Sequence, residues 1–151
     1  MDLLERLRNI LDESGDQDNP GPDVVRQVME SARKVAVVGI SRNPEKAARW
    51  IPAYLAAKGY NVIPVNPFVD KVLGKKAMPS LAEVTEPVDM VLVFRPSLEA
   101  AAVVEAAMER EEKPVIWLQE GIRADEAAAR ARARGFTVIQ DLCASKVHKA
   151  L

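Results

Sequence analysis

The residues best placed to bind a ligand lie in one segment, Lys34–Trp50, which reads KVAVVGISRNPEKAARW. Its apolar half predicts a buried parallel strand, because such strands are covered by helices on both faces and read as nearly unbroken Val, Ile and Ala. Gly39 then allows a sharp turn or a close approach to a ligand. Ser41 and Asn43 are typical helix caps and Pro44 suits a first helical position, so backbone N–H groups at the positive end of a helix dipole should face outward. Phosphate is the usual ligand of such a turn.

Length and composition narrow the class of protein. A chain of 151 residues fits one domain and buries enough surface to fold without disulfides. Cys143 is the single cysteine, which excludes an internal disulfide and fits a reducing compartment. No segment resembles a secretion signal or reaches membrane-spanning length, so we expect a cytoplasmic protein without a membrane partner. With 21 Lys and Arg against 22 Asp and Glu, the chain has no net positive charge that would attract nucleic acid. Any anion must therefore bind at a local site.

Hydrophobic periodicity predicts two helices, 3–14 and 22–32, ahead of an alternating region. That region contains apolar strands separated by helical or turn-rich segments. The expected strands are 34–39, 60–65, 88–94, 114–118 and 136–140, and the expected helices are 44–58, 79–84, 97–110 and 123–134. Strands that alternate with helices indicate right-handed crossovers and a parallel sheet. We predict an α/β, doubly wound, Rossmann-like fold with five parallel strands in the order 3-2-1-4-5 and extra N-terminal helices.

Ligands of open parallel sheets bind beyond the carboxyl ends of the strands, where the strand order reverses. Three loops should meet there, and they comprise residues 39–44, 66–71 and 95–97. A nicotinamide dinucleotide fits them poorly, because Ser41 and Pro44 stand where its fingerprint needs glycines. The second strand ends Val65-Asn66-Pro67, with no carboxylate for the ribose hydroxyls.

Cations near the predicted site favour a ligand with a phosphorylated ribose. Arg42 and Lys71 follow the first and second strands, and coenzyme A carries both a diphosphate and a 3′-phosphate. Several motifs in order across about residues 23–145 resemble the stand-alone CoA-binding-domain proteins, which are related to the CoA-binding domain of the succinyl-CoA synthetase alpha subunit. The motifs are VAVVGISRNPEK at 35–46, GYNVIPVNP at 59–67, LGKKAMPSLAEV at 73–84, VDMVLVFRP at 88–96, VIWLQEGI at 115–122 and DLC at 141–143.

We expect an N-terminal helix and loop at 1–21, followed by a CoA-binding Rossmann-like domain at 22–151. The resemblance implies a set of cofactor-binding residues in that domain. The first loop would hold the phosphates, the second the adenosine and its phosphate, and the third the nucleotide or the pantetheine arm. The residues are Gly39, Ile40, Ser41, Arg42, Asn43 and Pro44 in the first loop, Asn66, Pro67 and Lys71 in the second, and Phe94, Arg95 and Pro96 in the third. The corresponding loop of the synthetase is richer in glycine. In this chain the resemblance therefore implies that the diphosphate would also contact the Arg42 side chain.

Catalytic and metal-binding patterns are absent from the sequence. A hydrolase triad needs a base and a nucleophile elbow, and a metal site needs several spaced ligands. The only histidine, His148, lies near the C-terminus, where we expect an exposed and inert side chain. We therefore expect a protein that binds CoA or acyl-CoA without resident catalytic machinery. The alternatives are a non-catalytic component of an acyl-CoA synthetase or ligase system, whose protein partner is unidentified, and an NAD-binding redox sensor.

Overall fold

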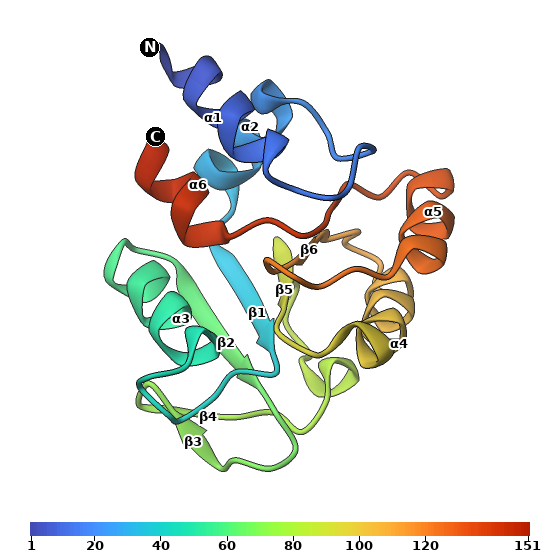
Figure 1. Ribbon diagram of the computed structural model, residues 1–151. Coiled ribbons are helices and arrows are strands. Elements are labelled where there is room, and N and C mark those ends of the chain that lie inside the picture. The colour runs from blue at the N-terminus through green and yellow to red at the C-terminus, as the bar shows by residue number, and fades with distance from the viewer.

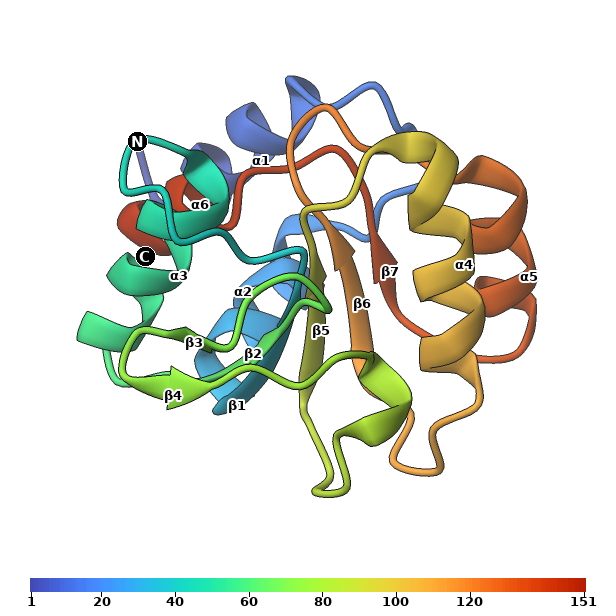
Figure 2. The ribbon, with the colours of Figure 1, turned by 90° about the horizontal axis from the view of Figure 1, so that it is seen from below.

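The computed structural model describes all 151 residues and is built around one parallel sheet. Its strands are short apolar runs, almost wholly buried, as expected for strands that helices cover on both faces. They are β1 (Lys34–Val38), β2 (Asn61–Val65), β5 (Met90–Val93), β6 (Val115–Leu118) and β7 (Val138–Ile139). They run side by side in the order β2-β1-β5-β6-β7 (Figure 2).

Helices cover both faces of this sheet, and successive side chains of each strand enter two separate cores. One core is shared by α1 (Leu3–Asp12), α2 (Pro22–Ser31), α3 (Ala47–Ala57) and α6 (Ala144–Ala150). The other is shared by α4 (Ser97–Met108), α5 (Asp125–Ala133) and the short 3-10 helix η1 (Leu81–Glu83). Figure 1 shows α4 and α5 together on one side of the molecule, with α1, α2 and α6 gathered on another. The doubly wound α/β prediction is confirmed.

The observed strand order differs from the predicted one in one respect. Counted along the chain, the five strands lie 2-1-3-4-5, because β5 lies between β1 and β6, with Val35 opposite Met90, and not at the edge beside β2. An apolar run predicts that a strand is buried but does not say which strand it adjoins. In both orders the strand order reverses at one point, which here lies between β1 and β5. The carboxyl edge of the sheet at this point therefore remains the expected place for a ligand.

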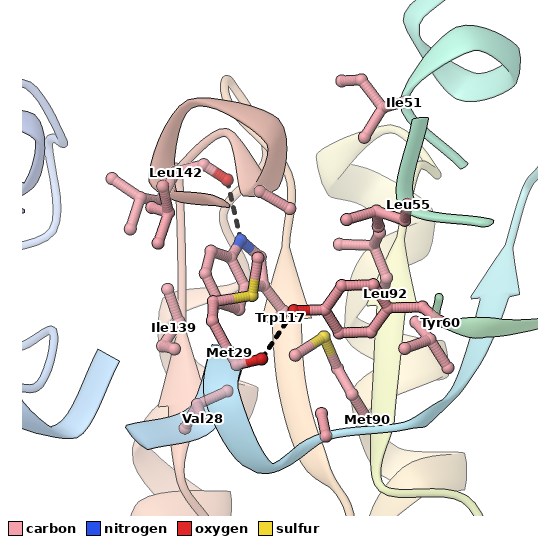
Figure 3. Packing of buried hydrophobic residues seen from close by; sticks show 14 of the residues in the cluster. Val28, Met29, Ile51, Leu55, Tyr60, Met90, Leu92, Trp117, Ile139 and Leu142 are labelled. Carbon is pink, nitrogen blue, oxygen red and sulfur yellow. Dashed lines mark hydrogen bonds between the residues drawn. The ribbon is translucent and has the colours of Figure 1, made fainter. Parts of the chain in front are cut away.

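Trp117 is the largest fully buried side chain of the chain. It lies on the face of the sheet that α2 and α6 cover. Its Nε1 donates a 2.8 Å hydrogen bond to the Leu142 carbonyl, and the Tyr60 hydroxyl donates one of 2.6 Å to the Met29 carbonyl (Figure 3). Both polar atoms are therefore satisfied inside the apolar layer. The other tryptophan, Trp50, is 42% exposed, and the Lys149 ammonium lies over its ring.

The free edge of β2 is covered by a segment for which the sequence predicts only a loop and a short helix. A hairpin of β3 (Lys71–Val72) and β4 (Lys75–Lys76) folds beside it. The Lys75 ammonium donates a 2.8 Å hydrogen bond to the Val62 carbonyl, while Pro64 has no N–H to offer a further strand. Lysine and proline at an edge oppose pairing with another chain.

The end of the chain is ordered, contrary to our expectation of an exposed tail. His148 lies in α6, and its Nδ1 is hydrogen-bonded to the Tyr54 hydroxyl at 2.6 Å. The imidazole meets the rings of Tyr54 and Tyr60 edge to face, at centroid distances of 5.3 and 5.7 Å. Burial, with a smaller contribution from the Lys58 charge, lowers the pKa of His148 below its ordinary value of 6.5. The side chain therefore packs as a neutral ring and is not free at the surface.

A polar network ties the loop after α1 to the end of the sheet. Asp16 is buried, accepts a 3.0 Å hydrogen bond from Arg132 and another of 2.9 Å from the Gln140 side chain, and accepts one from the Asp18 N–H. Burial by itself raises the pKa of Asp16, but these hydrogen bonds outweigh it, so the pKa lies below its ordinary value of 3.8. Leu7 and Leu11 of α1 are buried in the same core as α2 and α6.

We expect Asp16→Asn to lower the free energy of unfolding by about 1.5–3 kcal/mol at neutral pH, the range for hydrogen bonds to a charged group. Because the pKa of Asp16 is lower in the folded state, its contribution is present above the unfolded pKa and is lost as the pH falls through the folded value. Urea unfolding at pH 7 and at pH 3 measures this. The difference between wild type and variant should shrink at the lower pH. Asp18→Asn is the matched control, and an equal loss there would contradict the assignment.

Candidate functional site

The turn after β1 depends on a glycine. Gly39 has φ of +89°, a value that side chains disfavour. A Cβ added there would lie 2.9 Å from Cδ of Arg95 and 3.2 Å from the backbone carbon of Phe94. The glycine therefore lets the first and third candidate loops approach each other at the carboxyl edge of the sheet.

Our expectation for the first loop is wrong in its details. Helix α3 begins at Ala47, with Lys46 in the cap position, so neither Ser41 nor Asn43 caps it and Pro44 is not its first residue. The two polar side chains instead stabilise consecutive turns. Ser41 Oγ accepts from the Asn43 N–H and Asn43 Oδ1 accepts from the Glu45 N–H, both at 3.0 Å. Serine and asparagine favour such local turns for the same reason that they favour caps, so the sequence could not distinguish the two.

A proline inside α3 anchors this loop. Pro52 has no N–H, so the carbonyl of Ala48, four residues earlier, has no helical donor. That carbonyl accepts a 3.0 Å hydrogen bond from the N–H of Ser41. The helix interruption thus provides the acceptor that holds the middle of the loop against the first turn of α3.

Four backbone N–H groups in this region have no acceptor in the chain, namely those of Ile40, Arg42, Ala47 and Ala48. Two belong to the turn and two to the first turn of α3, where the helix dipole is positive. The Ile40 side chain is fully buried in the core, so only its backbone is available to a ligand. The Arg42 side chain is exposed and forms no ion pair or hydrogen bond. The arrangement suits an anion.

The second loop is connected to the first through Asn66. Its Nδ2 donates a 2.8 Å hydrogen bond to the Ile40 carbonyl, and its Oδ1 accepts one of 2.7 Å from the Phe68 N–H. Its own N–H donates to the carbonyl of Met78 at 2.8 Å. Asn66 therefore links three segments by hydrogen bonds: the β1 turn, its own loop and the segment that follows β4. Lys71 is exposed at the start of β3 and has no carboxylate partner.

The third loop leads from β5 into α4. Phe94 extends the sheet, since its N–H donates to the carbonyl of Val38 at 2.9 Å, and Pro96 occupies the cap position of α4. Arg95 turns back and forms an ion pair with Glu99, one helical turn later. The guanidinium is partly buried, and the stem of the same side chain lies against Gly39.

A cleft of about 260 Å³ opens between these loops and α4. Of the predicted site residues, it brings together Gly39, Asn66, Pro67 and Arg95. The other eight predicted residues lie outside its lining. The rest of the wall is Val38, Val65, Pro79, Ser80, Leu81, Glu99, Ala102, Val103 and Ala106. These residues were not predicted from the sequence, although the spacing of 99, 102, 103 and 106 marks one helical face.

Two larger cavities, of about 460 and 420 Å³, lie at the opposite end of the sheet. Their linings include Val88, Val115 and Tyr60, which precede or begin strands, so they sit at the amino ends. Ligands of open parallel sheets occupy the carboxyl edge, so position favours the smaller cleft over these two. Cys143 is buried, with Sγ 3.1 Å from the Ser145 hydroxyl.

Comparison with known proteins identifies the family of the chain. Residues 33–149 match the family model described as CoA binding domain. The chain belongs to this CoA-binding-domain family. It is 37% identical over 130 residues to the YneT protein of Bacillus subtilis (strain 168), covering 86% of this chain and 96% of that protein. The resemblance expected from the sequence motifs is confirmed.

Solved structures show the same fold in the family's size range. A protein of Pyrococcus horikoshii OT3 superposes with a TM-score of 0.81 at 31% identity, covering 85% of this chain and 90% of that one. A Thermus thermophilus protein gives 0.78 at 34% identity, covering 84% and 96%. Prb, which is described as redesigned for binding, gives 0.84 at 30% identity, covering 89% and 94%. No helix of the chain is both long and apolar enough to span a bilayer.

We expect Pro52→Ala to loosen the β1 turn without weakening the fold. The new N–H at position 52 would compete with Ser41 for the Ala48 carbonyl, and removal of the proline ring would make α3 more regular. Amide hydrogen exchange at Ser41 should accelerate, while the urea midpoint stays equal or rises. Pro87→Ala, at an exposed loop proline before β5, should change neither. Unchanged protection of Ser41 in Pro52→Ala would show that this hydrogen bond does not anchor the turn.

Proposed function

We propose that the chain binds CoA or an acyl-CoA at the carboxyl edge of the sheet and does not itself transform it. Membership of the CoA-binding-domain family supports a CoA-type ligand in general. The single observation that carries the placement is that the Ile40 and Arg42 N–H groups of the β1 turn have no acceptor in the chain, in a loop that also carries the exposed Arg42 side chain. The diphosphate would bind there, with the adenosine against Asn66 and Pro67.

The diphosphate requires several hydrogen-bond donors that are already in place. The N–H groups of Ile40 and Arg42 in the turn, and those of Ala47 and Ala48 at the start of α3, offer four. The turn is held on both sides, by the Ser41 bond to Ala48 and by the Asn66 bond to Ile40. Donors that are fixed before binding lose little entropy when the ligand arrives. Arg42 adds a mobile charge to this backbone site.

The 3′-phosphate needs a cation on the adenosine side. Lys71 begins the hairpin that follows the adenosine loop, and its ammonium has no carboxylate partner. We assign it to the ribose phosphate. Phe94, Arg95 and Pro96 form the opposite side of the edge, with Arg95 and Pro67 both against the cleft. In this proposal Arg95 keeps Glu99 as its partner and contributes its aliphatic stem to the wall.

The structure gives NAD no comparable support. A ribose diol is held in dinucleotide folds by a carboxylate at the end of the second strand. Here that position is Asn66, whose amide is already committed to Ile40 and Phe68. The side chain therefore serves the loops and is not free to receive two hydroxyls.

Titration calorimetry with CoA, dephospho-CoA and NAD tests the proposal. CoA should bind more tightly than dephospho-CoA, and NAD should bind most weakly. Arg42→Glu should weaken CoA binding by about 1–3 kcal/mol, the range for loss of a charge-assisted phosphate contact. Arg8→Glu, at an exposed arginine of α1, is the matched control and should leave the affinity unchanged. Equal affinities for CoA and dephospho-CoA would refute a role for the ribose phosphate.

A further inference from the structure

Positive charges gather on and beside α3, and no carboxylate of the chain pairs with them. Residues 42–58 include four basic side chains and a single acidic one, Glu45. Lys46, Arg49 and Lys58 form no ion pair. Arg42, the fourth cation, is already assigned to the diphosphate. The whole chain has a net charge of -1, so this excess of positive charge is a local feature.

The neighbouring helix α6 extends this charged surface and joins it to two aromatic rings. Lys149 Nζ lies 5.6 Å from the centroid of the Trp50 ring and 5.1 Å from that of the Tyr54 ring. Lys58 Nζ lies 5.6 Å from the Tyr54 centroid. Figures 1 and 2 show α3 and α6 on the same side of the molecule, and the two helices are in contact. The α3–α6 surface comprises Lys46, Arg49, Trp50, Tyr54, Lys58 and Lys149.

The residue types and the length of the α3–α6 surface indicate what would cover it. Trp, Tyr and Arg are the residues that most often dominate the binding energy of protein complexes, and here Trp50 is exposed beside Arg49. From Lys46 to Lys58 the surface runs along the whole of α3, roughly 18 Å at the rise of an α-helix. A second helix lying along α3 would therefore reach the cations at both of its ends.

We propose that the α3–α6 surface binds an acidic, amphipathic helix of another protein. Carboxylates of that helix would pair with the free cations, and its apolar side chains would cover Trp50. This inference goes beyond the proposed function and does not depend on where CoA binds.

Other occupants fit the α3–α6 surface less well. A second copy of the chain, docked face to face, would bring like charges together, which is unfavourable. A lipid surface needs several apolar anchors, and Trp50 is the only large hydrophobic side chain exposed on this surface. The net charge of -1 gives nucleic acid no general attraction to the chain. An acidic helix needs only the local cations and one apolar contact.

Fluorescence and calorimetry on the full chain test the proposal. The probe is a helical peptide of about 20 residues, long enough to form a helix in water, with Glu on one face and Leu on the other. It should shift Trp50 emission to shorter wavelength, while Trp117 is buried and does not respond. A matched peptide with Gln in place of Glu should bind roughly 3- to 100-fold more weakly, the loss expected for three exposed ion pairs.

Variants place the peptide on the α3–α6 surface. Arg49→Glu and Lys149→Glu should each weaken the acidic peptide by roughly 2- to 30-fold, because each loses an ion pair and gains a repulsion of similar size. Arg134→Glu is the matched control, at an exposed arginine that caps α5 on the opposite face of the sheet, and it should leave the affinity unchanged. The urea midpoints of all three variants should match that of wild type.

Several results would overturn the proposal. Equal affinities for the Glu and Gln peptides would remove charge complementarity, and unmoved Trp50 emission at saturation would place the peptide elsewhere. An equal loss in Arg49→Glu and Arg134→Glu would do the same. Binding of single-stranded DNA or anionic vesicles that Arg49→Glu abolishes, without binding of the acidic peptide, would assign the surface to nucleic acid or lipid. A wild-type dimer that Arg49→Glu converts to a monomer in sedimentation would assign it to a second copy of the chain.

Discussion

The close approach of two backbone turns at Gly39 is the constraint on which the carboxyl edge depends. Because this residue has no Cβ and adopts φ of +89°, the chain leaving β1 can pass against Phe94 and the stem of Arg95. A side chain there would push the β1 turn away from the loop that follows β5. The cleft, the exposed N–H groups and the start of α3 all follow from where this turn lies.

The β1 turn is held in place by hydrogen bonds to residues outside it. Pro52 leaves the Ala48 carbonyl free for the N–H of Ser41, and Asn66 holds the Ile40 carbonyl from the neighbouring loop. A turn that is bonded from both sides presents its remaining N–H groups in fixed directions, which is what an anion site needs. A feature that normally weakens a helix thus stabilises a loop.

Predictions from the sequence succeeded where the signal was local. Five strands and the helices between them were expected from apolar runs and helical spacing, and each was found within a few residues of its predicted place. The β3–β4 hairpin was missed because its strands are two residues each, too short to show alternation. The ordering of α6 was missed because a terminal segment without strong periodicity reveals nothing of the surface that it meets, here Tyr54 and Tyr60.

The sequence by itself determined that a buried strand ends at Gly39 in a polar turn, and that Asn66 and Arg95 follow the next two long apolar strands along the chain. These features are encoded within a few residues, through backbone freedom and side-chain polarity. Only the tertiary structure decided that β5 lies beside β1, that Ser41 bonds to Ala48, and that α4 forms the cleft wall. Such facts depend on pairings between distant segments, which are selected by the packing of the whole core and leave no signature in either segment alone.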